Sequence, residues 1–210
     1  MKVILAVFAA IAVLYFSISY FLSIPEATYD FREVLQPQNQ PIQQHTSEPQ
    51  FSNDLYQKVK FTPKANYQID ARLLHKKKYY KGIEAKTIPW DFALGWGIMS
   101  DPKSLEGLKV KQTIRFYRYS WGPGYSIPQL QIKDNSANCH LIPATKNLKK
   151  VMGKIKKDDV LRIEGFLVDV SFEHKRPYVW RTSTIRTDEG AGACETIYVK
   201  SIVWNGKLYR

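Results

Sequence analysis

A run of uncharged residues near the start of the chain limits what this sequence can fold into more than any other feature. From Val3 to Leu22 it reads VILAVFAAIAVLYFSISYFL, in which two serines and two tyrosines are the only polar side chains. As a helix this run would be about 30 Å long, which matches the hydrocarbon thickness of a bilayer. A segment that is apolar on every face does not suit the surface of a small domain. We therefore expect residues 1–24 to form a transmembrane helix.

This helix is expected to remain as an anchor. A cleavable signal has a shorter apolar core and small residues before the cut, whereas Pro25 stands at such a position for cleavage after Ala27. Cleavage after Ala27 is the alternative. Lys2 and the very short amino-terminal tail favour a cytosolic amino end. The predicted protein crosses the cytoplasmic membrane once, with its C-terminal domain on the periplasmic, extracytoplasmic side.

The remainder divides into a spacer and one domain. Residues 25–54 are rich in Gln and Pro and poor in apolar residues, so they bury too little surface to offset their ordering entropy. Prolines at positions 37, 41 and 49 favour an extended spacer between the membrane and the domain. Residues 55–210 have the size of a single domain with its own core.

The predicted domain is strongly basic. The chain has 31 Lys and Arg against 19 Asp and Glu, a net charge of +12, and only Lys2 and Arg32 among its basic residues precede position 55. Such a surface attracts anionic partners. The expected partners are the membrane itself and an anionic ligand, such as a lipid head group or an acidic glycan, or another envelope protein. A location outside the cytosol disfavours nucleic acid as the ligand. The alternative is a solvated basic surface that binds no specific ligand.

Alternating β-branched and aromatic residues predict a mainly β domain. Residues 108–121 are expected to form one long, curled strand. Further strands are expected at 67–74, 127–132, 160–170, 178–185 and 196–204. One short helix is expected after Thr145, which can cap a segment whose apolar stripe is Leu148, Val151, Met152 and Ile155.

This order of elements resembles the oligonucleotide/oligosaccharide-binding (OB) barrel, whose helix lies between the third and fourth strands. The segment Asp159–Gly165, DVLRIEG, resembles the entry to the fourth strand of such barrels. The resemblance implies a small antiparallel β-barrel with one short helix. The segments Trp90–Asp101 and Arg181–Glu195 also resemble membrane-anchored bacterial envelope proteins, which implies the bacterial inner membrane as the location and no particular chemistry.

The two cysteines, Cys139 and Cys194, have two interpretations. Outside the cytosol, a single pair of cysteines favours a structural disulfide. A loop of this length, once closed, would stabilise the domain by about 4 kcal/mol in the chain-entropy model. In the alternative, Cys194 is a nucleophile and no bridge forms.

An anchor, a spacer and a β-barrel resemble the sortases, transpeptidases that use His, Cys and Arg. The segment Cys139–Ala144, CHLIPA, resembles the one that carries the sortase histidine. The resemblance implies His140 as that histidine, Cys194 as the nucleophile and Arg210 as the arginine, with Lys207 as the other downstream cation. Two features depart from the pattern: Cys194 follows a Gly/Ala-rich loop, and Arg210 is the last residue.

Cations alternate with aromatic rings in one segment. Its candidate ligand-binding residues are Arg115, Tyr117, Arg118, Tyr119 and Trp121, because rings and guanidinium groups on one face stack on bases or sugars and pair with anions. In the other interpretation, some of the rings belong to the core and the arginines protect a sheet edge. A second basic patch, suited to lipid head groups, is Lys76, Lys77 and Lys78.

No histidine spacing in the chain indicates a metal site, and no motif indicates a cofactor. The leading hypothesis is a non-catalytic, membrane-anchored envelope protein that binds an anionic ligand or a protein partner. The alternative is a cysteine-dependent transpeptidase or hydrolase that uses Cys194 and His140. A third hypothesis is a subunit of a larger membrane assembly.

Overall fold

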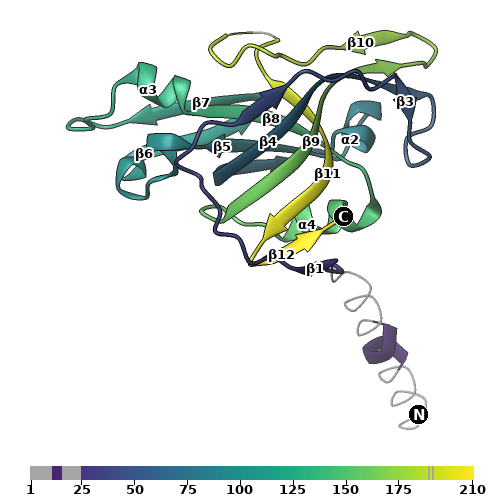
Figure 1. The fold of residues 1–210 in the computed structure, drawn as a ribbon, viewed down its shortest axis with the longest axis horizontal. Helices are drawn as coiled ribbons and strands as arrows, with labels where there is room; N and C mark the ends of the chain where they lie inside the picture. The colour runs from purple at the N-terminus through teal and green to yellow at the C-terminus, as the bar shows by residue number, and fades with distance from the viewer. Residues whose placement is uncertain (1–10, 16–24, 189, 191) are drawn as a thin grey trace, which may run out of the picture.

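The structure, a computed structural model, describes residues 11–15, 25–188, 190 and 192–210 (Figure 1). The predicted anchor therefore lies outside the described residues, apart from a helical stretch at 11–15. In the part that is described, no helix is both long enough and apolar enough to cross a bilayer. The fold is mainly β with few helices, as the sequence predicted.

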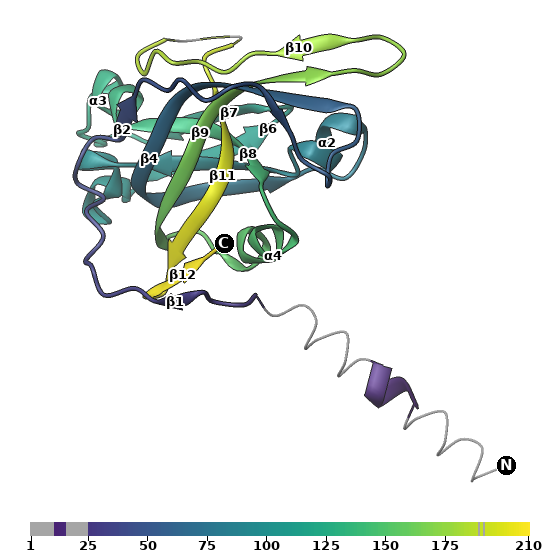
Figure 2. The same ribbon diagram turned by 45° about the vertical axis from the view of Figure 1, so that its right-hand side comes forward.

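Five strands form the centre of the domain: β4 (Val59–Lys78), β5 (Trp90–Gly95), β8 (Ser136–Pro143), β9 (Val160–Phe172) and β11 (Glu195–Trp204). Each pairs with two of the others, in the cyclic order β4-β5-β8-β11-β9 and back to β4. Of these five pairings, the one between β8 and β11 is parallel and the others are antiparallel. Figure 2 shows β4, β9 and β11 running side by side.

The predicted helix is confirmed as α4 (Lys146–Lys154). Thr145 Oγ1 accepts a hydrogen bond from the backbone N–H of Leu148 at 3.1 Å, the expected N-cap. The apolar stripe of α4 packs into the main core between the five strands. The other short elements are α2 (Ile83–Thr87), the 3₁₀ turns η1 (Gly97–Ser100) and η2 (Lys103–Leu105), α3 (Gln129–Asp134), β10 (Tyr178–Trp180) and β12 (Lys207–Tyr209).

The long strand expected at 108–121 is a hairpin instead. Strands β6 (Leu108–Thr113) and β7 (Phe116–Trp121) pair with each other around a turn at Ile114 and Arg115. Both turn residues have positive φ, 48° and 68°, a conformation that two-residue hairpin turns require and that Gly or Asn usually supplies. Neither Ile nor Arg is typical of such turns. The alternating sequence pattern therefore predicted one continuous strand through this position.

Two further strand predictions need correction. Residues 127–132 run into helix α3, which begins after Pro128, since the fixed φ of proline suits a helix start. The strand expected at 178–185 ends at Trp180. The strands expected at 67–74, 160–170 and 196–204 lie within β4, β9 and β11.

The segment predicted as a spacer lies along the domain. It contains β1 (Tyr29–Asp30), which pairs with β12, and β2 (Ile42–Gln44) and β3 (Phe51–Ser52), which both pair with β4. Its glutamines also bond to the domain, since Gln40 Oε1 accepts from Trp96 Nε1 at 3.0 Å. Backbone pairing and side-chain hydrogen bonds stabilise this segment, so it does not need a core of its own.

The β6–β7 hairpin packs over β4 and β5, and its side chains hydrogen-bond to Ser136 and Asn138 of β8. A small cluster under it contains Leu74, Ala93, Met99 and Ile132. Residues of β8 alternate, so that Cys139 and Leu141 point into the main core and Asn138 and His140 point outward, toward the hairpin. The polar side chains of this outer face form the candidate site.

Candidate active site

The centre of the site is a buried pair, Asp91 and His140. They are direct partners in the antiparallel pairing of β5 with β8. His140 Nδ1 donates to Asp91 Oδ1 at 2.8 Å. Asp91 is fully buried and His140 is 3% exposed. A carboxylate that holds one ring nitrogen fixes the orientation of the imidazole and leaves the other nitrogen for a reacting group.

Arg115 brings a second cation to the same carboxylate oxygen. Its Nη1 donates to Asp91 Oδ1 at 2.7 Å, and its Nη2 donates to the carbonyl of Ile88 at 3.0 Å. Its guanidinium lies 3.7 Å from the ring centre of Tyr79. The positive φ of Arg115 turns the hairpin tip into the site, and backbone strain of this kind often marks a functional position.

Cys194 reaches the site from the other side, at the start of β11. Its carbonyl accepts from the N–H of Ser183 at 3.0 Å, which ties it to the segment that follows β10. Gly192, at φ 95°, makes the turn that leads into it. Cys194 Sγ donates to the carbonyl of Arg115 at 3.8 Å, and it lines one pocket together with His140 and lies close enough to raise the pKa of that imidazole.

Asn138 supports the thiol from β8. Its Nδ2 lies 3.6 Å from Cys194 Sγ and donates to the carbonyl of Arg115 at 3.0 Å. Its Oδ1 accepts from Gln112 Nε2, whose own Oε1 faces His75 Nδ1 at 2.9 Å. This chain of hydrogen bonds fixes the amide group next to the sulfur.

The charges of the site favour a protonated His140. Burial alone would lower the pKa of this imidazole, but the hydrogen bond and charge of Asp91 and the neighbouring Cys194 raise it from 6.5 to about 9. Burial likewise opposes ionisation of Asp91, yet His140 and Arg115 hold its pKa below the ordinary value. At neutral pH the site therefore contains an aspartate and an imidazolium that contacts a thiol.

The predicted disulfide between Cys139 and Cys194 is wrong: both cysteines are free. The strand register explains this, because Cys139 pairs with Glu195 rather than with Cys194. Cys139 is fully buried in the main core, whereas Cys194 lies outside it and is partly exposed. Burial, followed by nearby acidic groups, raises the pKa of the Cys139 thiol well above its usual range, so this thiol is unreactive.

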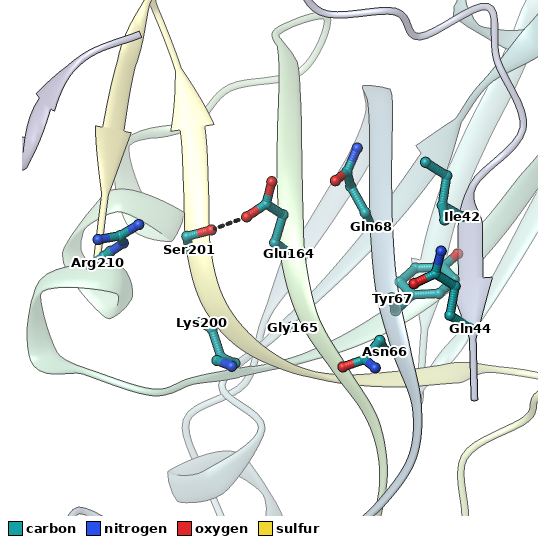
Figure 3. A pocket seen from close by; sticks show the side chains of 10 residues that line it. All are labelled: Ile42, Gln44, Asn66, Tyr67, Gln68, Glu164, Gly165, Lys200, Ser201 and Arg210. Carbon is teal, nitrogen blue, oxygen red and sulfur yellow. Dashed lines mark hydrogen bonds between the residues drawn. The ribbon is translucent and has the colours of Figure 1, made fainter. Parts of the chain in front are cut away.

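Arg210 does not join Cys194 and His140. It follows β12, which pairs with the far end of β11, so it lies about 20 Å along the strand from Cys194. It lines a separate pocket of 560 Å³ together with Lys200 and Glu164. Figure 3 shows this pocket, with Arg210 next to Ser201. The carboxylate of Glu164 accepts there from Ser201 Oγ at 2.9 Å. The arginine of the site is Arg115.

The other predicted ligand-binding residues have different surroundings. Tyr117, Tyr119 and Trp121 form a row of ring contacts on the side of β7 that faces the small cluster, while Arg118 is exposed. Lys76 Nζ donates to the carbonyls of Met152, Gly153 and Ile155 at the end of α4. This contact is structural, since cations stabilise helix C-termini. Lys77 and Lys78 are exposed.

Two pockets meet at Cys194. The aromatic pocket, of 410 Å³, is lined by Phe116, Tyr178, Val179 and Trp180 together with His140 and Cys194. The polar pocket, of 420 Å³, includes Arg118, Asn138, Arg186 and Glu195 as well as Cys194. Burial and then Asp188 raise the pKa of Glu195 to about 7. A thiol on the border of two pockets can meet two parts of one substrate, or two substrates.

The sequence reasoning missed Asp91 and the strand that carries it. The available signal was one acidic residue inside the apolar stretch Trp90–Gly95. A charge in such a strand is expected to be paired when the strand is buried. Among the described residues, no cluster of three or more His, Cys, Asp or Glu side chains is arranged to hold a metal ion.

Comparison of the chain with protein-family models, curated proteins and solved structures found no match. The chemistry of the site is therefore inferred from its geometry alone.

Proposed function

We propose that this chain is a cysteine-dependent acyl-transfer enzyme, a hydrolase or transpeptidase, with Cys194 as its nucleophile. The observation that carries the proposal is the buried His140, hydrogen-bonded to the Asp91 carboxylate and lining one pocket with Cys194. A thiol beside a base that is oriented by a third group is the arrangement found in nucleophilic catalysis. A non-catalytic binding protein has no need of a buried Asp91–His140 pair beside a partly exposed cysteine.

The residues divide the reaction between them. Cys194 attacks the acyl carbon of the substrate as a thiolate, after its thiol proton has gone to solvent, because His140 already carries a proton as the imidazolium. His140 gives its proton to the leaving group as that bond breaks, which leaves a thioester on Cys194 and a neutral imidazole. Water or an amine then attacks the thioester, gives its proton to His140, and releases the product and the thiolate. Asp91 keeps the imidazole oriented and stabilises its cationic form.

Asn138 and Arg115 serve this chemistry without exchanging protons. The Asn138 amide, 3.6 Å from the sulfur, is placed to stabilise negative charge beside it. Arg115 neutralises Asp91 further and holds the hairpin tip over the site. Without Asp91, a buried imidazolium and a guanidinium would face each other unpaired, which is costly in a low-dielectric interior.

We also infer that the five central strands form a closed barrel of the OB type. Their cyclic pairing, the single parallel pair and the helix between the third and fourth strands support this. Ligands of OB barrels bind across the second and third strands. In this chain those are β5 and β8, which carry Asp91 and His140.

We also propose that the protein is anchored in the membrane, as its sequence predicts. The uncharged run of residues 3–22 supports a single-pass anchor in the bacterial inner membrane, with the β domain outside the cytosol. The enzyme would then act on acyl compounds of the cell envelope. The basic surface of the domain favours anionic ones.

An activated ester tests the proposed activity. With p-nitrophenyl acetate, the full-length chain should release about one equivalent of p-nitrophenolate in a burst, as a thioester forms, before slower turnover. Cys194→Ala should abolish the burst, and Cys139→Ala, which removes the thiol buried in the core, should retain it. A burst that persists in Cys194→Ala would rule out this cysteine as the nucleophile.

A further inference from the structure

The aromatic pocket beside Cys194 combines apolar walls with basic side chains, of which Arg181 has no ion-pair partner among the described residues. Phe116, Tyr178 and Val179 expose 44%, 39% and 44% of their surface there, although large apolar side chains are usually buried. They come from two separate hairpins, β6–β7 and β9–β10, that converge on the thiol. This convergence favours an apolar ligand group next to the sulfur.

The charged residues that line the aromatic pocket are all basic among those the structure describes. They are Arg115, Arg181 and His140, whose imidazole has a pKa of about 9. Asp91 lies beneath them and already pairs with both Arg115 and His140. Arg181, by contrast, is exposed and has no hydrogen-bond or ion-pair partner among the described residues. Its charge remains available to a ligand.

We propose that the aromatic pocket is the acyl subsite, and that it takes an apolar acyl chain whose far end carries an anionic group paired with Arg181. The inference rests on the proposed function, because the acyl carbon has to lie at Cys194. The apolar part of the chain lies against Phe116, Tyr178 and Trp180, and the leaving group points into the polar pocket. The charge on Arg181 selects the anionic chain and assists its approach.

Two esters of equal length separate charge from size. The probes are p-nitrophenyl hexanoate and the mono-p-nitrophenyl ester of adipic acid, which have the same six-carbon acyl chain and differ in a terminal carboxylate. The full-length chain should show a kcat/KM about fivefold higher for the anionic ester, the value of one partly exposed ion pair. About 0.5 M NaCl should remove most of this preference.

Variants assign the preference to one residue. Arg181→Gln should equalise the two esters by raising KM for the anionic one, and Arg181→Lys should restore part of the preference. Arg176→Gln is the matched control, because Arg176 is an exposed arginine outside the pocket, and it should behave as the wild type. Equal kcat/KM values for the two esters, or a preference that survives in Arg181→Gln, would overturn the subsite. If neither ester gave a burst, the proposed function itself would fail.

Discussion

Iodoacetamide should modify Cys194 of the folded protein about 100-fold faster than Cys139, because the two thiols have opposite surroundings. Cys194 lines two pockets and contacts a histidine that is charged at neutral pH. Cys139 has no exposed surface, and burial raises its pKa well above the usual range. Peptide mapping by mass spectrometry after short exposures measures both rates in one sample.

The same labelling experiment has internal controls. In denaturant the two cysteines should react at similar rates, since the folded surroundings are lost. His140→Ala should slow the labelling of Cys194 by about tenfold, because the positively charged side chain beside the reacting sulfur is gone. Cys139→Ala should leave it unchanged. Protection of both cysteines until a reductant is added would instead indicate the disulfide that the sequence favoured.

Gly165→Ala should destabilise the fold by about 3 kcal/mol, because β9 and β11 approach each other too closely for a side chain there. An added Cβ would lie 1.9 Å from the backbone carbonyl oxygen of Tyr198. The pairing of β9 with β11 is irregular at this point, between Val199 and Ser201. Since the clash is with backbone, rotation of a side chain cannot relieve it, and one of the central pairings has to shift.

Thermal unfolding of the full-length chain measures this effect. A loss of about 3 kcal/mol should lower Tm by about 6–12 °C in a domain of this size. The control is Gly153→Ala in α4, where a Cβ would meet Trp90 at an ordinary 3.8 Å. It should be neutral or stabilising, because alanine favours a helix more than glycine does. Equal Tm values for the two variants would contradict the close approach of β9 and β11.

The fold could be predicted where the pattern was local. The Thr145 cap and the apolar stripe after it identified α4, and β-branched residues identified β4, β9 and β11 in part. The β6–β7 turn could not be predicted, because Ile114 and Arg115 adopt positive φ only under tertiary constraint. The hydrogen bonds between residues 25–54 and the domain could not be predicted either, because their partners lie far away in the sequence.

The site was predicted only in part. The sequence led us to consider Cys194 and His140 together, and both line the aromatic pocket, but the arginine was placed at Arg210 by resemblance rather than by geometry. Arg115 was noted as a ligand-binding candidate, and its pairing with Asp91 depends on the unforeseen hairpin turn. The pairing of two cysteines could not be judged from their number, because strand register decides which side chains meet.

The protonation of His140 depends on the same contacts and affects stability. Its pKa is higher in the folded chain than the ordinary 6.5. Its charged form therefore contributes stability fully below about pH 6.5, and this contribution is lost as the pH rises through about 9. The raised value depends on both neighbours, Asp91 and Cys194.

Titration of His140 by NMR tests most directly whether Asp91, His140 and Cys194 form one unit. The imidazole signal, assigned by its absence in His140→Ala, should titrate near pH 9 in the wild type. In Asp91→Asn the midpoint should fall to the ordinary 6.5 or below, because burial then dominates. Cys194→Ala, which keeps the carboxylate, should lower it by a smaller amount. A wild-type midpoint near 6.5 that neither substitution moves would contradict the triad and the activity proposed from it.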